Sequence, residues 1–66
     1  MNTSSKRLIK ILEERGFIFQ RVKGSHHVFF NAEKYITVVV PVHNKDLKLG
    51  TFLGILKQAA IRRKDL

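Results

Sequence analysis

Three short runs of aromatic and β-branched residues in the middle of the chain constrain its fold most strongly. They cover residues 17–23, 26–31 and 35–40. Gly24-Ser25 separates the first two runs and Asn31–Lys34 the last two, and both separators contain residues that favour turns. Because such short connections join antiparallel neighbours, the pattern predicts a three-stranded antiparallel meander.

Segments with helical spacing flank the three strands. Over residues 5–15 and 51–60 the apolar side chains recur three or four residues apart, which predicts one amphipathic helix on each side of the strands. One of the hydroxyl residues at positions 3–5 is placed to cap the first helix, Gly16 to end it in a left-handed conformation, and Thr51 to cap the second helix.

The order helix, strand, strand, strand, helix predicts an α+β fold. Both helices are expected to pack on one face of the sheet, as they do in double-stranded RNA-binding domains. The 66 residues form one domain. A chain of this size buries only about 60% of the surface that its unfolded form exposes, so the core must be small.

Charge and composition narrow the classes of partner. Thirteen Lys and Arg against five Asp and Glu give a net charge of +8, which is typical of a nucleic-acid binder or of a domain with an acidic protein partner. The absence of Cys excludes disulfides, thiolate zinc sites and thiol catalysis, and fits a reducing cytosol. The longest apolar run, Val38–Val42, is far short of the ~20 residues that cross a bilayer, so we expect a cytoplasmic protein without a membrane segment.

The strongest candidate for chemistry is the segment Lys23-Gly24-Ser25-His26-His27. A histidine, with an unperturbed pKa of about 6.5, exchanges protons near neutral pH, and the basic surroundings favour a phosphate substrate. Successive side chains on a strand point to opposite faces, so His26 and His27 cannot both reach one substrate atom. Gly24 and Ser25 would let a phosphate backbone approach, although they are also ordinary turn residues, and a lone histidine is often only a surface or structural residue.

A second candidate group follows the third strand. His43, Lys45 and Lys48 lie in a basic loop, and Thr51 lies at the expected start of the second helix, where unpaired backbone N–H groups attract anions. We interpret these residues as RNA contacts, and His43 as a binding or structural residue rather than a second acid. A simple cap beside solvated lysines explains them equally well. The carboxylates form no pattern of metal ligands, so we expect neither metal nor cofactor.

The order of these features resembles the HicA toxin family, the mRNA interferases of type II toxin–antitoxin systems. The resemblance extends from about Ser4 to Ile61 and rests on three segments at this spacing: Lys23-Gly24-Ser25-His26-His27, Val38-Val39-Val40-Pro41-Val42-His43 and Leu49-Gly50-Thr51. It implies a fold like that of double-stranded RNA-binding domains, a ribonuclease that cleaves mRNA and blocks translation and growth, and a HicB-like antitoxin that covers the active site. It places the essential histidine at His26, with His27 as the alternative because some members carry that histidine one place later.

The residues and the resemblance lead to one hypothesis about mechanism. His26 acts as a general base on the ribose 2′-OH beside the scissile phosphate, or on a water, and Lys23 stabilises the developing charge without a metal. The free chain is expected to be a monomer that joins its antitoxin in a hetero-oligomer. Two alternatives remain, an RNA-binding module that never cleaves and a domain for an acidic protein partner. The expected RNA contacts are Lys23, Gly24, Ser25, His43, Lys45, Lys48 and Thr51.

Overall fold

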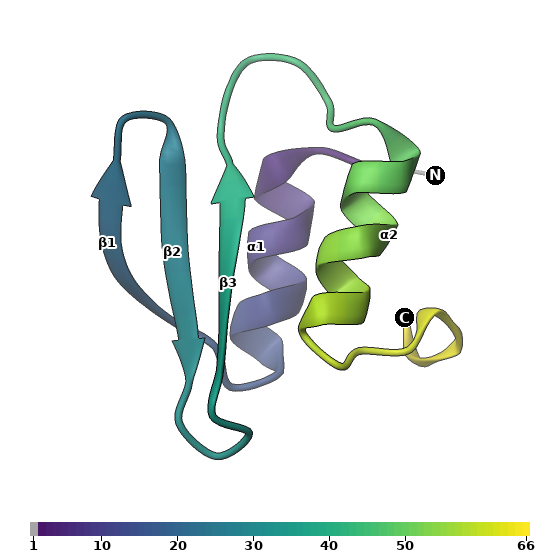
Figure 1. Cartoon of the computed structure of the whole chain (residues 1–66). Helices are drawn as coiled ribbons and strands as arrows, with labels where there is room; N and C mark the ends of the chain where they lie inside the picture. Colours follow the sequence, from purple (N-terminus) through teal and green to yellow (C-terminus); the bar gives the residue numbers. More distant parts are fainter. Residues whose placement is uncertain (1) are drawn as a thin grey trace.

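Two helices and a three-stranded sheet make up the chain in its computed structural model, which describes residues 2–66 (Figure 1). The strands pair antiparallel in the order β1-β2-β3. The predicted α+β fold, with its α-β-β-β-α order typical of double-stranded RNA-binding domains, is confirmed. The elements are α1 (Ser5–Glu14), β1 (Ile18–Lys23), β2 (His26–Asn31), β3 (Ile36–Pro41), α2 (Leu49–Gln58) and a 3₁₀ turn, η1 (Arg63–Asp65).

The first helix begins and ends as its sequence predicts. Ser4, one of the three candidate caps, accepts a hydrogen bond from the Arg7 N–H on its Oγ at 3.1 Å. After the helix the Phe17 N–H donates to the Leu12 carbonyl at 3.0 Å, and Gly16 takes a φ of 87°. This is the left-handed turn that glycine favours, because a side chain would strain that backbone conformation.

The second helix begins earlier than predicted. It starts at Leu49 rather than near residue 51, because Lys48 already has the extended backbone of a cap and its carbonyl accepts from the Phe52 N–H at 2.9 Å. Thr51 is therefore the third residue of α2 and does not cap it. Neither helix within residues 2–66 has the length and apolar character needed to cross a membrane.

The end of α2 repeats the turn that ends α1, but without a glycine. The Ile61 N–H donates to the Leu56 carbonyl at 2.9 Å, and the residue with left-handed backbone is Ala60, at a φ of 59°. Left-handed backbone costs an ordinary residue about 1–2 kcal/mol. The turn therefore stores strain that a glycine would relieve.

The third strand lies one residue later than predicted. Tyr35 has a φ of 60° and belongs to the turn before β3, so the strand begins at Ile36. At its other end β3 includes Pro41, which pairs with His26. β3 is an edge strand, so alternate N–H groups along it point away from the neighbouring strand. Proline, which has no N–H, is therefore compatible with this strand.

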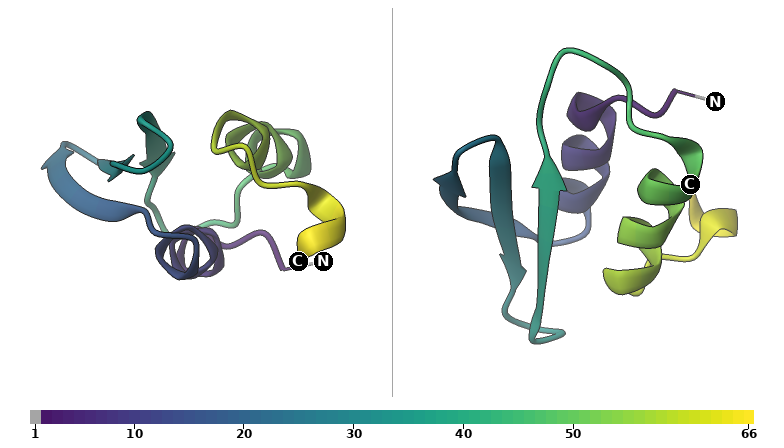
Figure 2. Two further views of the ribbon diagram at one scale, coloured as in Figure 1. Left: turned by 90° about the horizontal axis from the view of Figure 1, so that it is seen from below. Right: turned by 45° about the horizontal axis from the view of Figure 1, so that its top comes forward.

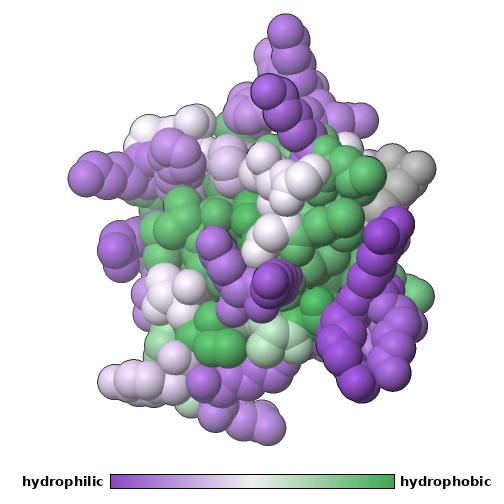
Figure 3. Space-filling view, turned by 45° about the vertical axis from the view of Figure 1, so that its right-hand side comes forward, coloured by the Kyte–Doolittle hydropathy of each residue, from purple (hydrophilic) through white to green (hydrophobic). Residues whose placement is uncertain are grey.

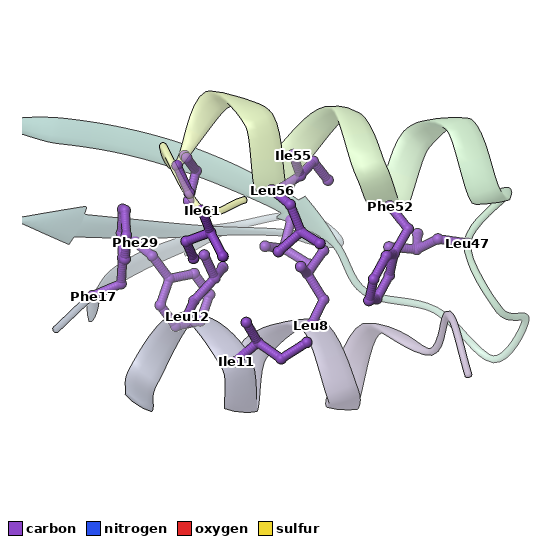
Figure 4. Close-up of a cluster of buried hydrophobic side chains, with 13 residues drawn as sticks. Leu8, Ile11, Leu12, Phe17, Phe29, Leu47, Phe52, Ile55, Leu56 and Ile61 are labelled. Atoms are coloured by element: carbon purple, nitrogen blue, oxygen red, sulfur yellow. The ribbon is translucent and has the colours of Figure 1, made fainter. Parts of the chain in front are cut away.

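The core lies between the sheet and the helices (Figure 4). Its largest fully buried side chains are Phe17, Phe29 and Phe52, which come from the turn after α1, from β2 and from α2. Leucine and isoleucine side chains of both helices pack around them. The sheet contributes to this core from one face only, through Phe29, Val38 and Val40.

The sheet therefore has an inner and an outer face. We call the face of Phe29, Val38 and Val40 the inner face, because both helices lie on that side, with α2 near the β3 edge (Figure 2). The opposite face, which we call the outer face, carries the alternate residues of each strand. Val28 belongs to it, since it lies outside the core cluster although it is only 6% exposed.

Candidate functional site

The two neighbouring histidines of β2 point to opposite faces of the sheet. His27 pairs with Val40, whose side chain is fully buried in the core, so His27 belongs to the inner face. His26 pairs with Pro41 on β3 and with Lys23 on β1, on the outer face. His26 is exposed and His27 is half-buried. Although they are adjacent in the sequence, His26 is open to solvent and His27 is directed toward the helices.

The surroundings of the histidines differ as well. The ring of His27 lies 5.6 Å from the ring of Phe19, tilted by 59°, which is an ordinary packing contact between aromatic rings. Within residues 2–66 none of the imidazoles of His26, His27 and His43 makes a side-chain hydrogen bond. The His26 ring is therefore exposed and, within the described residues, has no hydrogen-bond partner.

The turn between β1 and β2 leaves open space beside His26. Lys23 and His26 are paired residues at its two ends, which brings an ammonium group and an imidazole to the same face. Gly24 has a φ of 61°, the left-handed region that glycine tolerates best, and a Cβ added there would meet nothing within 4 Å. The backbone of the turn therefore favours glycine at position 24, and no neighbouring group would contact a side chain there.

Hydrogen bonds tie the end of β3 and the loop after it to this turn and to α1. The Val42 N–H donates to the Ser25 carbonyl at 2.7 Å, and the Ser5 hydroxyl donates to the Pro41 carbonyl at 2.8 Å. At the far end of the loop the Thr3 hydroxyl donates to the Leu47 carbonyl at 2.7 Å. The basic loop is therefore fixed at both ends, beside the turn and beside the start of α1.

A hollow of about 430 Å³ contains the whole second candidate group. It contains four of the expected RNA contacts together with Pro41, the pairing partner of His26. The other three expected contacts, Lys23, Gly24 and Ser25, lie on the adjoining turn. The hollow is lined by Pro41, His43, Lys45, Asp46, Leu47, Lys48 and Thr51.

The electrostatics of this end of the molecule favour an anion. The hollow and the adjoining turn carry three lysines, Lys23, Lys45 and Lys48, and the hollow carries one carboxylate, that of Asp46. The first turn of α2 carries no acidic residue and its cap makes no side-chain hydrogen bond, so its N–H groups keep their positive end uncompensated. Residues 2–66 bring no three His, Asp or Glu side chains together as ligands for a metal ion.

Sequence reasoning missed two residues that shape this site. Ser5 is buried and ties α1 to the end of β3, and Asp46 places a carboxylate among the lysines. A signal for Ser5 exists in the sequence, since Ser5, Leu8 and Leu12 share one helix face at spacings of three and seven residues. Asp46 has no comparable signal, because loop residues follow no period.

A second hollow lies at the C-terminal end of α2 and contains none of the expected site residues. Figure 3 shows apolar surface on this side of the molecule, with polar side chains projecting around it. The hollow is separate from the His26 region, which lies at the start of α2. It is lined by Leu53, Leu56, Lys57, Ala60, Ile61, Arg62 and Arg63.

Most of the chain is similar to a known protein family. The model of a family described as the HicA toxin of bacterial toxin–antitoxin systems matches residues 5–61, which is most of the chain. No curated protein matches the chain. The matched residues include both strands and the turn that carry Lys23 and His26, as well as the whole basic loop.

Proposed function

The chain belongs to the HicA toxin family, whose members are toxins of bacterial toxin–antitoxin systems, and from this membership we propose that it is an endoribonuclease with His26 as its general base. The proposed substrate is mRNA, and the proposed effect of its cleavage is to stop translation and growth. A toxin of this kind has an antitoxin partner. We place its action in the cytoplasm, where mRNA is translated.

The position of His26 is the observation that carries this proposal. Its ring is exposed on the outer face, opposite Lys23, at the end of the molecule where the basic hollow opens. His27 lies on the inner face beside Phe19, where the sheet and helices limit the approach of a polymer. An exposed imidazole beside cations fits proton transfer at a phosphodiester better than a half-buried one.

The proposed chemistry uses the ribose as the nucleophile. His26 removes the proton of a 2′-OH, the 2′-oxygen attacks the neighbouring phosphorus, and the 5′-oxygen leaves with a proton from solvent. The products are a 2′,3′-cyclic phosphate and a 5′-hydroxyl. The Lys23 ammonium stabilises the negative charge that develops on the phosphoryl oxygens. Acid–base transfer of this kind contributes about 10²–10⁴-fold to a rate.

The basic hollow is proposed to hold the phosphates that flank the reacting one. Lys45 and Lys48 supply charge, His43 and Thr51 supply hydrogen-bond donors, and the first N–H groups of α2 add the positive end of a helix. These contacts carry no sequence information. Because they depend on charge, RNA affinity should fall steeply as salt rises.

An RNA-integrity assay tests the proposal directly. Purified wild type and His26→Ala, matched for folding by circular dichroism, are incubated with mRNA in the presence of EDTA. We expect cleavage by the wild type alone, and no cleavage of an oligonucleotide whose reacting ribose is 2′-deoxy. Cleavage of the 2′-deoxy oligonucleotide would show instead that the base takes its proton from a water molecule, which then acts as the nucleophile. Equal cleavage by His26→Ala would refute His26 as the base, and cleavage lost in EDTA would show that a metal takes part.

A HicB-like antitoxin is proposed as the partner that covers His26. The toxin carries a net charge of +8, so the covering surface should be acidic. We expect the free toxin to be a monomer and the pair to form a hetero-oligomer. Adding the purified antitoxin to the cleavage assay should protect the RNA, and growth arrest on expressing the toxin alone should be reversed by coexpression.

One observation favours a second candidate, a non-catalytic RNA-binding module. Within residues 2–66 the His26 ring has no hydrogen-bond partner to orient it, whereas catalytic histidines are commonly oriented by a third group. This candidate predicts intact RNA with both proteins in the same assay, together with salt-dependent binding that His26→Ala changes little.

A further inference from the structure

The outer face of the sheet is built in three rows that run across the strands. The register places Lys23, His26 and Pro41 in the first row, nearest the basic hollow. Arg21, Val28 and Val39 form the middle row, and Ile18, Phe30 and Thr37 form the last. Within the described residues 2–66 no helix covers this face (Figure 2), and none of these positions carries a carboxylate.

The last row ends in an exposed pair of aromatic rings. The Phe30 and Tyr35 ring centroids are 5.8 Å apart and the rings stand at 75°, an edge-to-face arrangement. Phe30 is half-buried in the sheet, whereas Tyr35 is 85% exposed. The left-handed backbone of Tyr35 fixes its position in the turn beside the sheet. A large aromatic side chain therefore stands free at the end of the outer face opposite to His26.

We infer that the Phe30–Tyr35 pair is a stacking site for an unpaired base of RNA, in a strand that runs along the outer face to His26. The inference rests on the proposed RNA substrate and adds a binding site to it. Aromatic side chains on open sheets stack on bases in RNA-binding domains, since every base has a π-face. In a duplex these faces are occupied by neighbouring bases, so the site selects single-stranded RNA.

Charge and exposure favour a nucleic acid over an apolar partner on this face. Arg21 lies in the middle row, between the aromatic pair and His26, and Lys23 lies beside His26 in the first row, so both can pair with the phosphates of a bound strand. Ile18 in the last row is 69% exposed and Val39 in the middle row is 43% exposed, so the face offers apolar contact for bases rather than a core. Cations beside aromatic and apolar side chains are the combination that single strands require.

The length of the strand sets the distance between the two sites. His26 and Phe30 are separated by four residues of β2, or about 14 Å at the usual rise of an antiparallel strand. Sheets of comparable size in other RNA-binding proteins hold two or three stacked bases. The stacked base is therefore not the nucleotide that reacts but one that flanks it, and the site contributes affinity for single-stranded RNA.

Binding to an uncleavable strand tests this inference. The probe is a short, fluorescein-labelled, 2′-O-methylated single-stranded oligonucleotide, and anisotropy gives its Kd for the wild type and for Tyr35→Ala. A stacking contact predicts about 5- to 100-fold weaker binding by Tyr35→Ala. Tyr35→Phe should restore affinity, because the ring and not the hydroxyl makes the contact. Leu66→Ala is the matched control, since Leu66 is an exposed apolar side chain outside the sheet.

Each outcome separates this inference from the proposed nuclease. Equal Kd values for wild type and Tyr35→Ala would overturn the stacking site, as would equal affinity for the same sequence as a duplex. Weaker binding of the purified antitoxin to Tyr35→Ala, with RNA binding unchanged, would assign the face to the protein partner instead. A wild type that binds single strands through Tyr35 but cleaves nothing would refute the nuclease and keep the stacking site. A wild type that cleaves, with KM unchanged in Tyr35→Ala, would refute the stacking site alone.

Discussion

The inner and outer faces of the sheet are made from alternate residues of the same strands, yet they have different roles. On the inner face Phe29 and Val40 are buried beneath the helices and hold the fold together. On the outer face Val28 is buried although it lies outside the core cluster, while Val39, its partner on β3, is 43% exposed. The difference shows that apolar residues on an open face need not be core, and that His26 stands among residues available to a ligand.

The largest expected effect comes from removing one histidine or the other. His26→Ala should lower RNA cleavage by about 10²–10⁴-fold, because the general base is lost, while leaving stability close to that of the wild type. His27→Ala should keep most of the cleavage activity and lose some stability with the Phe19 contact. Parallel kinetics and urea unfolding of the two variants measure both quantities. If only His27→Ala abolished cleavage, the general base would be His27, on the inner face.

Two adjacent phenylalanines of β2 provide a similar contrast for stability. Phe29→Ala should reduce the free energy of unfolding by about 3–5 kcal/mol, since it empties a fully buried position in the core. Phe30→Ala should cost roughly 1 kcal/mol, because Phe30 is half-buried on the outer face. Urea denaturation followed by circular dichroism gives both values. Similar losses for the two variants would contradict the assignment of the faces.

Two lysine variants should differ in how strongly their RNA binding depends on salt. Lys23→Ala should weaken RNA binding and reduce the slope of log K against log salt by about one, as expected for the loss of one phosphate contact. Lys57→Ala is the matched control, because it removes the same charge at the C-terminal end of α2, whereas the basic hollow lies at the start of that helix. Anisotropy titrations at several salt concentrations measure the slopes. Equal slopes for the two variants would mean that net charge, rather than the position of Lys23, governs binding.

The smallest expected change leaves both faces untouched. Ala60→Gly should raise the free energy of unfolding by about 1 kcal/mol, since it removes the strain of a left-handed alanine. Cleavage should not change, because Ala60 lies beyond α2 and away from His26. Thermal or urea unfolding measures the gain. Unchanged stability would show that the turn after α2 relaxes without strain.

The sequence predicts the order of elements well because turns and helical spacing are local signals. It also predicts that His26 and His27 face opposite sides, since strands alternate. It does not predict which of them faces the helices. Each alternate set of β2 contains a histidine and an aromatic ring, so the period-two pattern is balanced and only packing against Phe52 and its neighbours decides.

Two boundaries predicted from the sequence differ from those in the structure. Thr51 has the side chain of a cap, but the chain turns into α2 at Lys48, which has no capping group of its own. Tyr35 directly precedes the β-branched run 36–40 in the sequence, yet in the structure it has left-handed backbone and belongs to the reversal between β2 and β3. In both places tertiary geometry overrides the preference of the single residue.

Valine methyl groups can show which face of the sheet binds RNA. Val28 and Val39 report on the outer face, and Val38 and Val40 on the inner face, within the same strands. The methyl spectrum of ¹³C-labelled protein is recorded during titration with the 2′-O-methylated single strand. If the outer face binds RNA, the Val28 and Val39 methyl signals shift while those of Val38 and Val40 stay in place. Shifts confined to Val38 and Val40, or to neither pair, would contradict the account.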